Sequence, residues 1–227
     1  MTYDAIFKRR AVRKYNETPV EQNVLDELNK LLKETKQIDG QEARFEINTS
    51  KEVKGPAPYY VSSFCREGDA SYANVGYILQ KADLFVQSKG LGSVYLAGKK
   101  PKTKLKTFCI VLAFGNSDVP FRAKMDFERL SVSEISTEDN PIAQAARLAP
   151  SAWNSQPWKL SFEDGKVIID YHGRGAFKLF FRNKLNMIDM GIVTRHVEES
   201  LLKEGKKVTS IVPENIGKGF RMTVSFE

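Results

Sequence analysis

The sequence predicts an α+β fold composed of two similar halves, and three observations support this prediction. Two long apolar stripes at helical spacing each stop at a glycine, Gly90 in the first half and Gly205 in the second. Each stretch holds an earlier glycine, Gly76 or Gly191, that precedes the stop by the same 14 positions. Each half then ends on an alternation of apolar residues that is typical of a half-buried strand. The alternating residues are Phe108, Ile110, Leu112 and Phe114 in one half, and Phe220, Met222, Val224 and Phe226 in the other.

The remaining elements follow from the same two periodicities. Shorter apolar stripes predict an early helix in each half, and three apolar runs predict further strands. The predicted helices cover 24–32, 75–90, 142–149 and 190–205, and the predicted strands cover 59–64, 108–114, 158–162, 166–171 and 220–226. Each half therefore reads as helix, strand, long helix, strand.

The boundary between the halves is expected between Asn116 and Asn140, where Pro120, serines and acidic residues interrupt the periodic pattern. We place the first half at 1–125 and the second at 126–227. The alternative is that two unrelated segments share a similar rhythm by coincidence.

Composition excludes several classes of protein. With 41% hydrophobic and 28% charged residues among 227, the chain reads as a soluble globular protein. The longest apolar run, 108–114, is too short for a membrane span, and no apolar stretch follows the basic N-terminus as in a secretory signal, so we expect a cytoplasmic location. Two cysteines, of which Cys109 is expected to be a buried inert thiol, provide neither a disulfide framework nor metal-ligand spacing. The net charge of +7 is compatible with nucleic acid, an anionic membrane surface or a small anionic ligand.

A basic cluster near the N-terminus is the first candidate site. Five cations fall within seven positions, namely Lys8, Arg9, Arg10, Arg13 and Lys14. Because an arginine presents a rigid fork of donors that grips a phosphate, such a cluster suits a dianion. The alternative is a solvated basic terminus.

A polar turn in the second half is the second candidate. The predicted helix ends at Pro150, and Ser151, Asn154, Ser155 and Gln156 follow it. These short polar side chains suit the polar edge of a planar heterocycle. The alternative is an ordinary turn between a helix and a strand.

Together the two clusters resemble signatures of the FMN-dependent nitroreductases. Arg9 to Arg13, Arg-Arg-Ala-Val-Arg, resembles the family's Arg-Arg-Ser-Val-Arg, and 149–158 resembles its longer Ala-Pro-Ser-x-x-Asn-x-Gln-Pro-Trp signature. Gly90 to Gly98 resembles the Gly-Leu-Gly turn that leads to a loop beside the flavin ring, and Phe114 to Lys124 resembles the closing strand and basic tail. The resemblance implies a three-layer α/β/α fold that binds FMN.

The arrangement of the signatures departs from the family. Ordinary members carry both signatures in one copy and form two flavin sites between identical subunits, whereas here 136 positions separate Arg13 from Ala149. The first half keeps the basic signature, and the second keeps the Pro-Ser motif but shows Arg129 to Ser133 near the basic position and Gly205 to Thr209 in place of the ring-side loop. The resemblance therefore implies a fused pseudo-dimer with one surviving site, complete within a monomer or weak oligomer.

The resemblance also implies roles for individual residues. Arg9 with Arg122 or Lys124 would hold the FMN phosphate, Arg13 would lie near the pyrimidine end of the ring, and the amides of 95–98 would face N5. Ala11 replaces the usual serine and removes one hydroxyl. The full set of expected cofactor residues is Arg9, Arg10, Ala11, Arg13, Tyr95, Leu96, Ala97, Gly98, Arg122, Lys124, Pro150, Ser151 and Asn154. No metal is expected, and no catalytic residue is assigned.

The implied activity is hydride transfer from NAD(P)H through FMN to a small planar acceptor, such as a nitroaromatic or a quinone. One alternative is a flavin-binding protein without turnover, used for storage or sensing. The lysine run 99–106 reads as a solvated loop and, without interleaved aromatic residues, is weak evidence for the other alternative, a nucleic-acid binder. His172 and His196 are isolated in sequence, and each is expected on the surface rather than in catalysis.

Overall fold

The computed structural model describes residues 2–103, 105, 107–122, 127–173 and 184–227. The first half contains α1 (Thr2–Ile6), α2 (Gln22–Glu34), β1 (Ala43–Thr49), β2 (Tyr59–Cys65), α3 (Asp69–Ser88), β3 (Gly92–Leu96) and β4 (Phe108–Gly115). The second half contains α4 (Val132–Ile135), α5 (Pro141–Arg147), the 3-10 helix η2 (Ala152–Asn154), β5 (Trp158–Glu163), β6 (Lys166–Tyr171), α6 (Lys184–Lys203), β7 (Val208–Ile216) and β8 (Gly219–Phe226). The predicted split between 125 and 126 falls on residues outside the described set, and it stays a prediction.

The strands form two antiparallel sheets of four, which confirms the predicted α+β class. The order is β1-β2-β4-β3 in one sheet and β5-β6-β8-β7 in the other, so both sheets connect their strands in the same order. The central strands of the first sheet are β2 and β4, in which Tyr59 pairs with Phe114. Those of the second sheet are β6 and β8, in which Val167 pairs with Val224.

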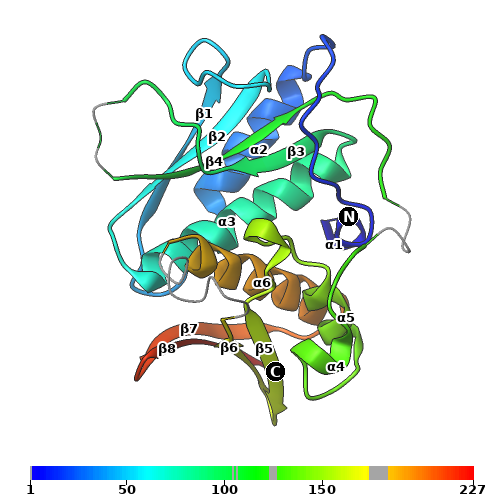
Figure 1. Cartoon of the computed structure of the whole chain (residues 1–227), viewed down its shortest axis with the longest axis vertical. Helices are drawn as coiled ribbons and strands as arrows, with labels where there is room; N and C mark the ends of the chain where they lie inside the picture. The colour runs from blue at the N-terminus through cyan, green and yellow to red at the C-terminus, as the bar shows by residue number, and fades with distance from the viewer. Residues whose placement is uncertain (1, 104, 106, 123–126, 174–183) are drawn as a thin grey trace.

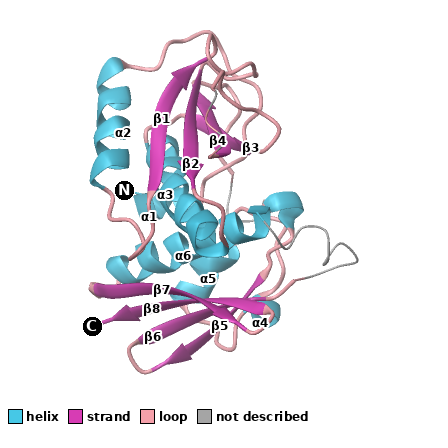
Figure 2. Ribbon diagram, turned by 90° about the vertical axis from the view of Figure 1, so that its left-hand side faces the viewer, coloured by secondary structure: helices cyan, strands magenta, loops and turns pink. Residues whose placement is uncertain are grey.

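The long helices lie between the two sheets, as Figures 1 and 2 show. Helix α3 packs on the first sheet, α6 packs on the second, and the two helices pack against each other. The layers therefore run sheet, helices, sheet, which differs from the expected α/β/α order. The physical reason is that α3 and α6 are buried over most of their surface, so each has protein on both sides.

Two glycines allow α3 and α6 to approach closely. A Cβ atom added to Gly76 would overlap the carbonyl oxygen of Ile188, and one added to Gly191 would overlap the carbonyl oxygen of Ala73. The glycines that mark the repeat in the sequence thus meet at the helix crossing. One hydrophobic core surrounds this crossing and includes residues from both halves, such as Leu28 and Trp158.

Three strands, two short helices and the 3-10 helix were not anticipated from the sequence: β1, β3, β7, α1, α4 and η2. Strand β3 lies inside the segment expected to be a loop, and β7 begins at Val208, within the segment 205–209 that was also read as a loop. Strand β7 is an edge strand that carries Pro213, which an edge tolerates because one side of its backbone is not paired. Within the described residues, no helix combines the length and apolar character that crossing a membrane requires.

Candidate cofactor site

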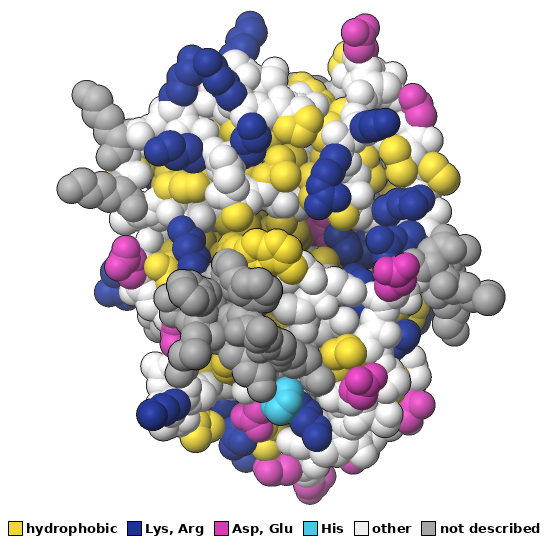
Figure 3. Space-filling model, viewed as in Figure 1, with side chains coloured by type: hydrophobic (Ala, Val, Ile, Leu, Met, Phe, Trp, Pro, Cys, Tyr) yellow, Lys and Arg dark blue, Asp and Glu magenta, His cyan; other side chains and the backbone are white. Residues whose placement is uncertain are grey.

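A cavity of about 240 Å³ lies where the two halves meet. Its walls come from the N-terminal segment, β3, β4, the turn after α5 and helix α6. Figure 3 shows hydrophobic side chains across the middle of the face seen in Figure 1, with Lys and Arg side chains around them. Seven of the expected cofactor residues line the cavity: Arg9, Ala11, Arg13, Tyr95, Ala97, Pro150 and Ser151.

Five other expected residues are described but are not part of this lining: Arg10, Leu96, Gly98, Arg122 and Asn154. Arg10 donates its backbone N–H to Gln87 at 2.8 Å, and its guanidinium reaches the carbonyl of Pro120 at 3.3 Å. Asn154 accepts a bond from Arg129 at 2.7 Å just beyond the cavity. Lys124 falls outside the described residues.

The basic segment is held in place by pairing with the edge strand β3. Ala11 forms a parallel bridge with Ser93, and the N–H of Val12 donates to the carbonyl of Ser93 at 2.9 Å. The two backbone segments come so close that a Cβ atom on Gly92 would lie 2.7 Å from the side chain of Val12. The Gly-Leu-Gly turn and the arginine signature are therefore parts of one local structure.

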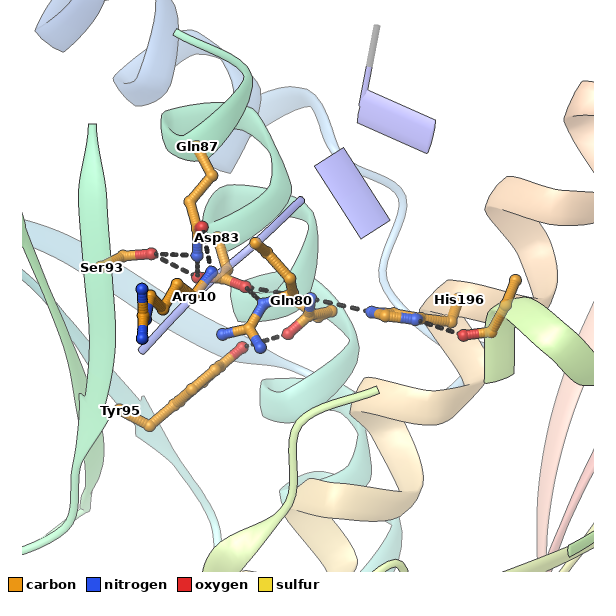
Figure 4. Close-up of polar contacts among 9 residues, drawn as sticks. Arg10, Gln80, Asp83, Gln87, Ser93, Tyr95 and His196 are labelled. Carbon is orange, nitrogen blue, oxygen red and sulfur yellow. Dashed lines mark hydrogen bonds and ion pairs between the residues drawn. The ribbon is translucent and has the colours of Figure 1, made fainter. Parts of the chain in front are cut away.

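A buried carboxylate fixes Arg9. The Arg9 Nε lies 2.7 Å from Asp83 Oδ2, and both side chains are almost fully buried. Asp83 also accepts hydrogen bonds from Gln80, Gln87 and Ser93, as Figure 4 shows. Because four donors surround this carboxylate, its position is determined and the Arg9 guanidinium is held in one orientation.

The same network extends to a buried histidine, and this corrects the expectation that His196 lies on the surface. His196 is fully buried, whereas His172 is exposed as predicted. The Tyr95 hydroxyl donates to Gln80 Oε1 at 3.0 Å, and Gln80 Nε2 lies 3.1 Å from His196 Nε2. On the other side of the ring, His196 Nδ1 lies 2.8 Å from the carbonyl oxygen of Ala145. These partners assign the proton to Nδ1. Burial, opposed by the Ala145 bond, lowers the pKa of His196 to about 3, so the ring is neutral.

The Pro-Ser motif forms a strained turn at the cavity mouth. Trp153, Asn154 and Gln156 adopt left-handed backbone conformations with φ of 50°, 57° and 45°. The Ser151 Oγ accepts the N–H of Gln156 at 2.9 Å and closes the turn. The Trp153 side chain lines the cavity and is 72% exposed, so it forms a rim rather than part of the core. Positive φ at three non-glycine residues stores strain that the surrounding structure must stabilise.

Asp189 is a cavity residue that the sequence analysis missed. It lies on α6, is 3% exposed, and accepts the N–H of Ala152 with both carboxylate oxygens at 3.1 and 3.2 Å. Burial raises its pKa to about 8, against the opposing effect of bonds from Ala152 and Asn186. The available signal was an acidic residue between Ile188 and Met190, inside an apolar helical stretch.

Arg129 is the second residue that was missed. Burial, and then the positive charges of Arg9, Arg122 and Arg147, lower its pKa to about 10. Its Nε is buried without a hydrogen-bond partner. Arg129 was interpreted as a remnant of a lost basic signature, yet the fold brings it to the arginines of the first half. A cluster of arginines with an unsatisfied donor suits a phosphate.

Among the described residues, no group of acidic, histidine and cysteine side chains is arranged to hold a metal.

Comparisons with known proteins identify a family model and solved structures that are similar to the chain. A family model described as "Putative TM nitroreductase" matches residues 1–200. A "putative nitroreductase" of Thermotoga maritima MSB8 superposes with a TM-score of 0.74 at 20% identity, over 99% of this chain and 93% of that one. A nitroreductase family protein of Clostridium difficile 630 gives a TM-score of 0.49 at 16% identity, over 61% and 98%. An FMN-dependent nitroreductase of Clostridium difficile R20291 gives 0.47 at 17% identity, over 60% and 98%.

A search of curated proteins gives no match. The superposition on the Thermotoga protein confirms the nitroreductase-like fold. Because the family model spans 200 of the 227 residues, the chain belongs to this nitroreductase family.

Proposed function

We propose that the chain binds one FMN in this cavity and transfers hydride from NAD(P)H to a small planar acceptor, such as a nitroaromatic or a quinone. Bound FMN supplies the hydride chemistry, and the protein supplies binding, orientation and charge. The observation that carries the proposal is that buried Arg9 lines an apolar cavity at the meeting of the two halves and lies close to Arg122 and Arg129.

The arginines at and beside the cavity fit a phosphate: Arg9 lines it, and Arg122 and Arg129 lie just outside its lining. Arg9 is oriented by Asp83, and Arg129 has a buried Nε that lacks a partner. Arg122 lies close enough for its charge to act on Arg129. We assign these three arginines to the FMN phosphate, because guanidinium forks match phosphate oxygens. Lys124 remains a predicted fourth contributor.

The rest of the cavity lining fits a flat ring. Val94, Ile110, Ile188 and Ile192 provide apolar walls. The segment 95–98 follows on from the wall formed by β3, and its backbone amides are the proposed partners of the ring's polar edge. Arg13 lines the cavity and is exposed, and at the pyrimidine end its charge would favour the anionic reduced flavin.

The described lining belongs to one chain and combines residues from 9 to 192. We therefore propose that the site needs no second copy, so that flavin stays bound in a species near the 25.7 kDa mass of the chain. Light scattering during dilution tests this. Release of flavin in step with dissociation of a dimer would place the site between chains instead.

FMN titration of the purified protein, followed by flavin absorbance and fluorescence, tests the binding site. Arg129→Met should weaken FMN binding about tenfold to a hundredfold, because one charge-assisted hydrogen bond contributes roughly 1.5 to 3 kcal/mol. The matched control is Arg66→Met, which removes an exposed arginine far from the cavity lining and should leave the affinity unchanged. Equal affinity in both variants would contradict the phosphate assignment.

Steady-state oxidation of NADH and NADPH in the presence of a quinone tests the activity. We expect turnover with at least one of the two nucleotides. Stoichiometric FMN binding without oxidation of either nucleotide would instead indicate a flavin-binding protein for storage or sensing.

A further inference from the structure

A buried acid faces the cavity, and among the described residues it forms no ion pair with a base. Asp189 lines the cavity between Ile188 and Ile192, and its side chain is almost inaccessible from the outer surface. The Ala152 N–H donates a hydrogen bond to it, and the Asn186 side chain also donates to it. A protonated carboxyl in this position therefore keeps these bonds with its oxygens and can direct its own proton toward the cavity.

The charges around Asp189 do not force it to ionise. The charged groups that share the cavity are Arg9 and Arg13 from the N-terminal segment, and Tyr95 is the titratable group on β3. Arg9 is already paired with Asp83 of α3, and no ion pair within the described part of the chain joins Asp189 to a cation. Burial raises the pKa of Asp189 to about 8, so the neutral acid predominates at pH 7.

The fold itself does not require an acid at this position. Asn74 lies two residues before Gly76, as Asp189 lies two residues before Gly191. The Asn74 Oδ1 accepts the N–H of Ile38 at 3.0 Å, in the same way that Asp189 accepts the N–H of Ala152. An amide oxygen is thus sufficient to hold the turn after the preceding helix. The exchangeable proton is what the acid adds.

We propose that Asp189 is the proton donor to the acceptor during hydride transfer, an inference that rests on the proposed function. A quinone acceptor takes two electrons and one proton as hydride, which originates from NAD(P)H, and needs one more proton to become a hydroquinone. The O–H bond of Asp189 breaks as that proton moves to the quinone oxygen. The carboxylate then regains a proton from water, so atoms and charge balance over one turnover.

The experiment uses the FMN-loaded protein and the variant Asp189→Asn, which keeps the oxygen that accepts the Ala152 N–H. Flavin is reduced with NAD(P)H without oxygen and then mixed with benzoquinone, and its reoxidation is followed by absorbance between pH 6 and 9. We expect reoxidation to slow about a hundredfold in the variant, the lower end of the usual contribution of a general acid. The rate in the unmodified protein should fall as pH passes 8, and the variant should lack this fall.

Two further measurements separate a proton donor from a structural residue. FMN affinity and the rate of flavin reduction by NAD(P)H are measured in the same variant, and the loss in reoxidation rate should far exceed any change in these two quantities. Asp170→Asn, which removes an acid from an ion pair with Arg221 on the second sheet, is the matched control and should reoxidise normally. Infrared difference spectra between pH 6 and 9 should show a carboxyl titration near pH 8 that Asp189→Asn abolishes.

The outcomes are distinguishable. Normal reoxidation with the same pH profile in Asp189→Asn would overturn the inference while leaving FMN binding and turnover intact. Failure of the unmodified protein to bind FMN would overturn the proposed function and the inference together. If the variant loses its flavin, the infrared titration decides, because a carboxyl that is already ionised at pH 6 cannot be the donor.

Discussion

Two pockets, each lined by residues of both halves of the molecule, differ greatly in volume. The candidate cofactor cavity of about 240 Å³ is bounded by the turn at 150–153, strand β3 and helix α6. A pocket of about 60 Å³ is bounded by the turn at 36–39, strand β7 and helix α3, with Glu198 of α6. Each pocket thus combines the turn after an early helix, an edge strand and a long central helix.

The smaller pocket is narrow because large side chains occupy it. Tyr77 stands where the larger cavity has Ile192, 115 positions later, the spacing that also relates Gly76 to Gly191. The guanidinium carbon of Arg195 lies 3.6 Å from the centre of the Tyr77 ring, and the Tyr77 hydroxyl donates to Glu198 at 2.8 Å. Arg195 also pairs with Glu198 on its own helix. The same backbone frame therefore gives an open or a filled pocket according to a few side chains.

The largest expected difference between the pockets is in how each affects the pH dependence of the free energy of unfolding. Replacing Asp189 by Asn, and Asn74 by Asp, tests this difference. Burial raises the Asp189 pKa from 3.8 to about 8. Between these values the folded state keeps a proton that the unfolded state has released, so the free energy of unfolding falls as pH rises from 4 to 8. Asp189→Asn should remove this loss, which is on the order of 5 kcal/mol.

Urea unfolding of the ligand-free protein at pH 4 to 8 measures this effect. The reciprocal variant Asn74→Asp should add a second fall in the free energy of unfolding as pH rises from 4 to 8. Parallel curves for all three proteins would mean that Asp189 is not protonated in the fold.

Removing the two buried arginines should give the next largest contrast. Arg9→Met leaves Asp83 charged and fully buried, and breaking a buried pair in this way costs about 3 to 5 kcal/mol. Arg195→Met should cost less, because the Glu198 side chain is 14% exposed and keeps its bond from Tyr77. Denaturant unfolding of both variants ranks the two costs. An equal or larger loss for Arg195→Met would contradict the view that the Asp83 network is the more demanding one.

The helix crossing is common to both pockets, and Gly191→Ala should disturb both. The added Cβ would overlap the backbone of Ala73 and force α3 and α6 apart, at a cost of roughly 2 to 3 kcal/mol. Gly98→Ala is the matched control, because a Cβ there meets no atom within 4 Å. Thermal unfolding of the two variants provides the comparison. Equal stability would show that the helices can shift without strain.

The smallest effect on stability is expected at the rim. Trp153 has a positive φ that favours glycine, so Trp153→Gly should change the free energy of unfolding by less than about 1 kcal/mol. If its indole covers one face of the flavin, the variant should accept bulkier acceptors in a turnover assay. Phe121→Ala, at another exposed aromatic residue outside the cavity, is the control. Unfolding of Trp153→Gly with an unchanged acceptor range would make Trp153 a structural residue.

Periodicity was sufficient to predict the long helices and the central strands, because their apolar patterns reflect burial directly. It was insufficient for the edge strands β3 and β7, which are defined by pairing with β4 and β8 rather than by their own composition. The layer order was also beyond reach, since it depends on the close approach of Gly76 to Ile188 and of Gly191 to Ala73, which lie more than 100 positions apart in sequence.

For the site, linear signatures predicted the residues that lie in contiguous motifs, such as Arg9, Ala11, Pro150 and Ser151. Asp189, Arg129 and His196 are different, because each gains its environment only when distant segments meet. A buried acid or histidine reads in sequence as an ordinary polar residue on a helix. The cofactor roles of all the residues expected from the signatures, those that line the cavity and those that do not, stay predictions, to be tested by FMN binding.

The span of the cavity lining, from Arg9 near the start of the chain to Ile192 near its end, has a consequence for biosynthesis. A ribosome makes the N-terminal segment first, and domains generally fold as units during synthesis. Here the wall that carries Ile188, Asp189 and Ile192 is among the last parts to be made. A chain truncated before α6 carries Arg9 and Arg13 but lacks this wall, so the pocket forms only after α6 has been made.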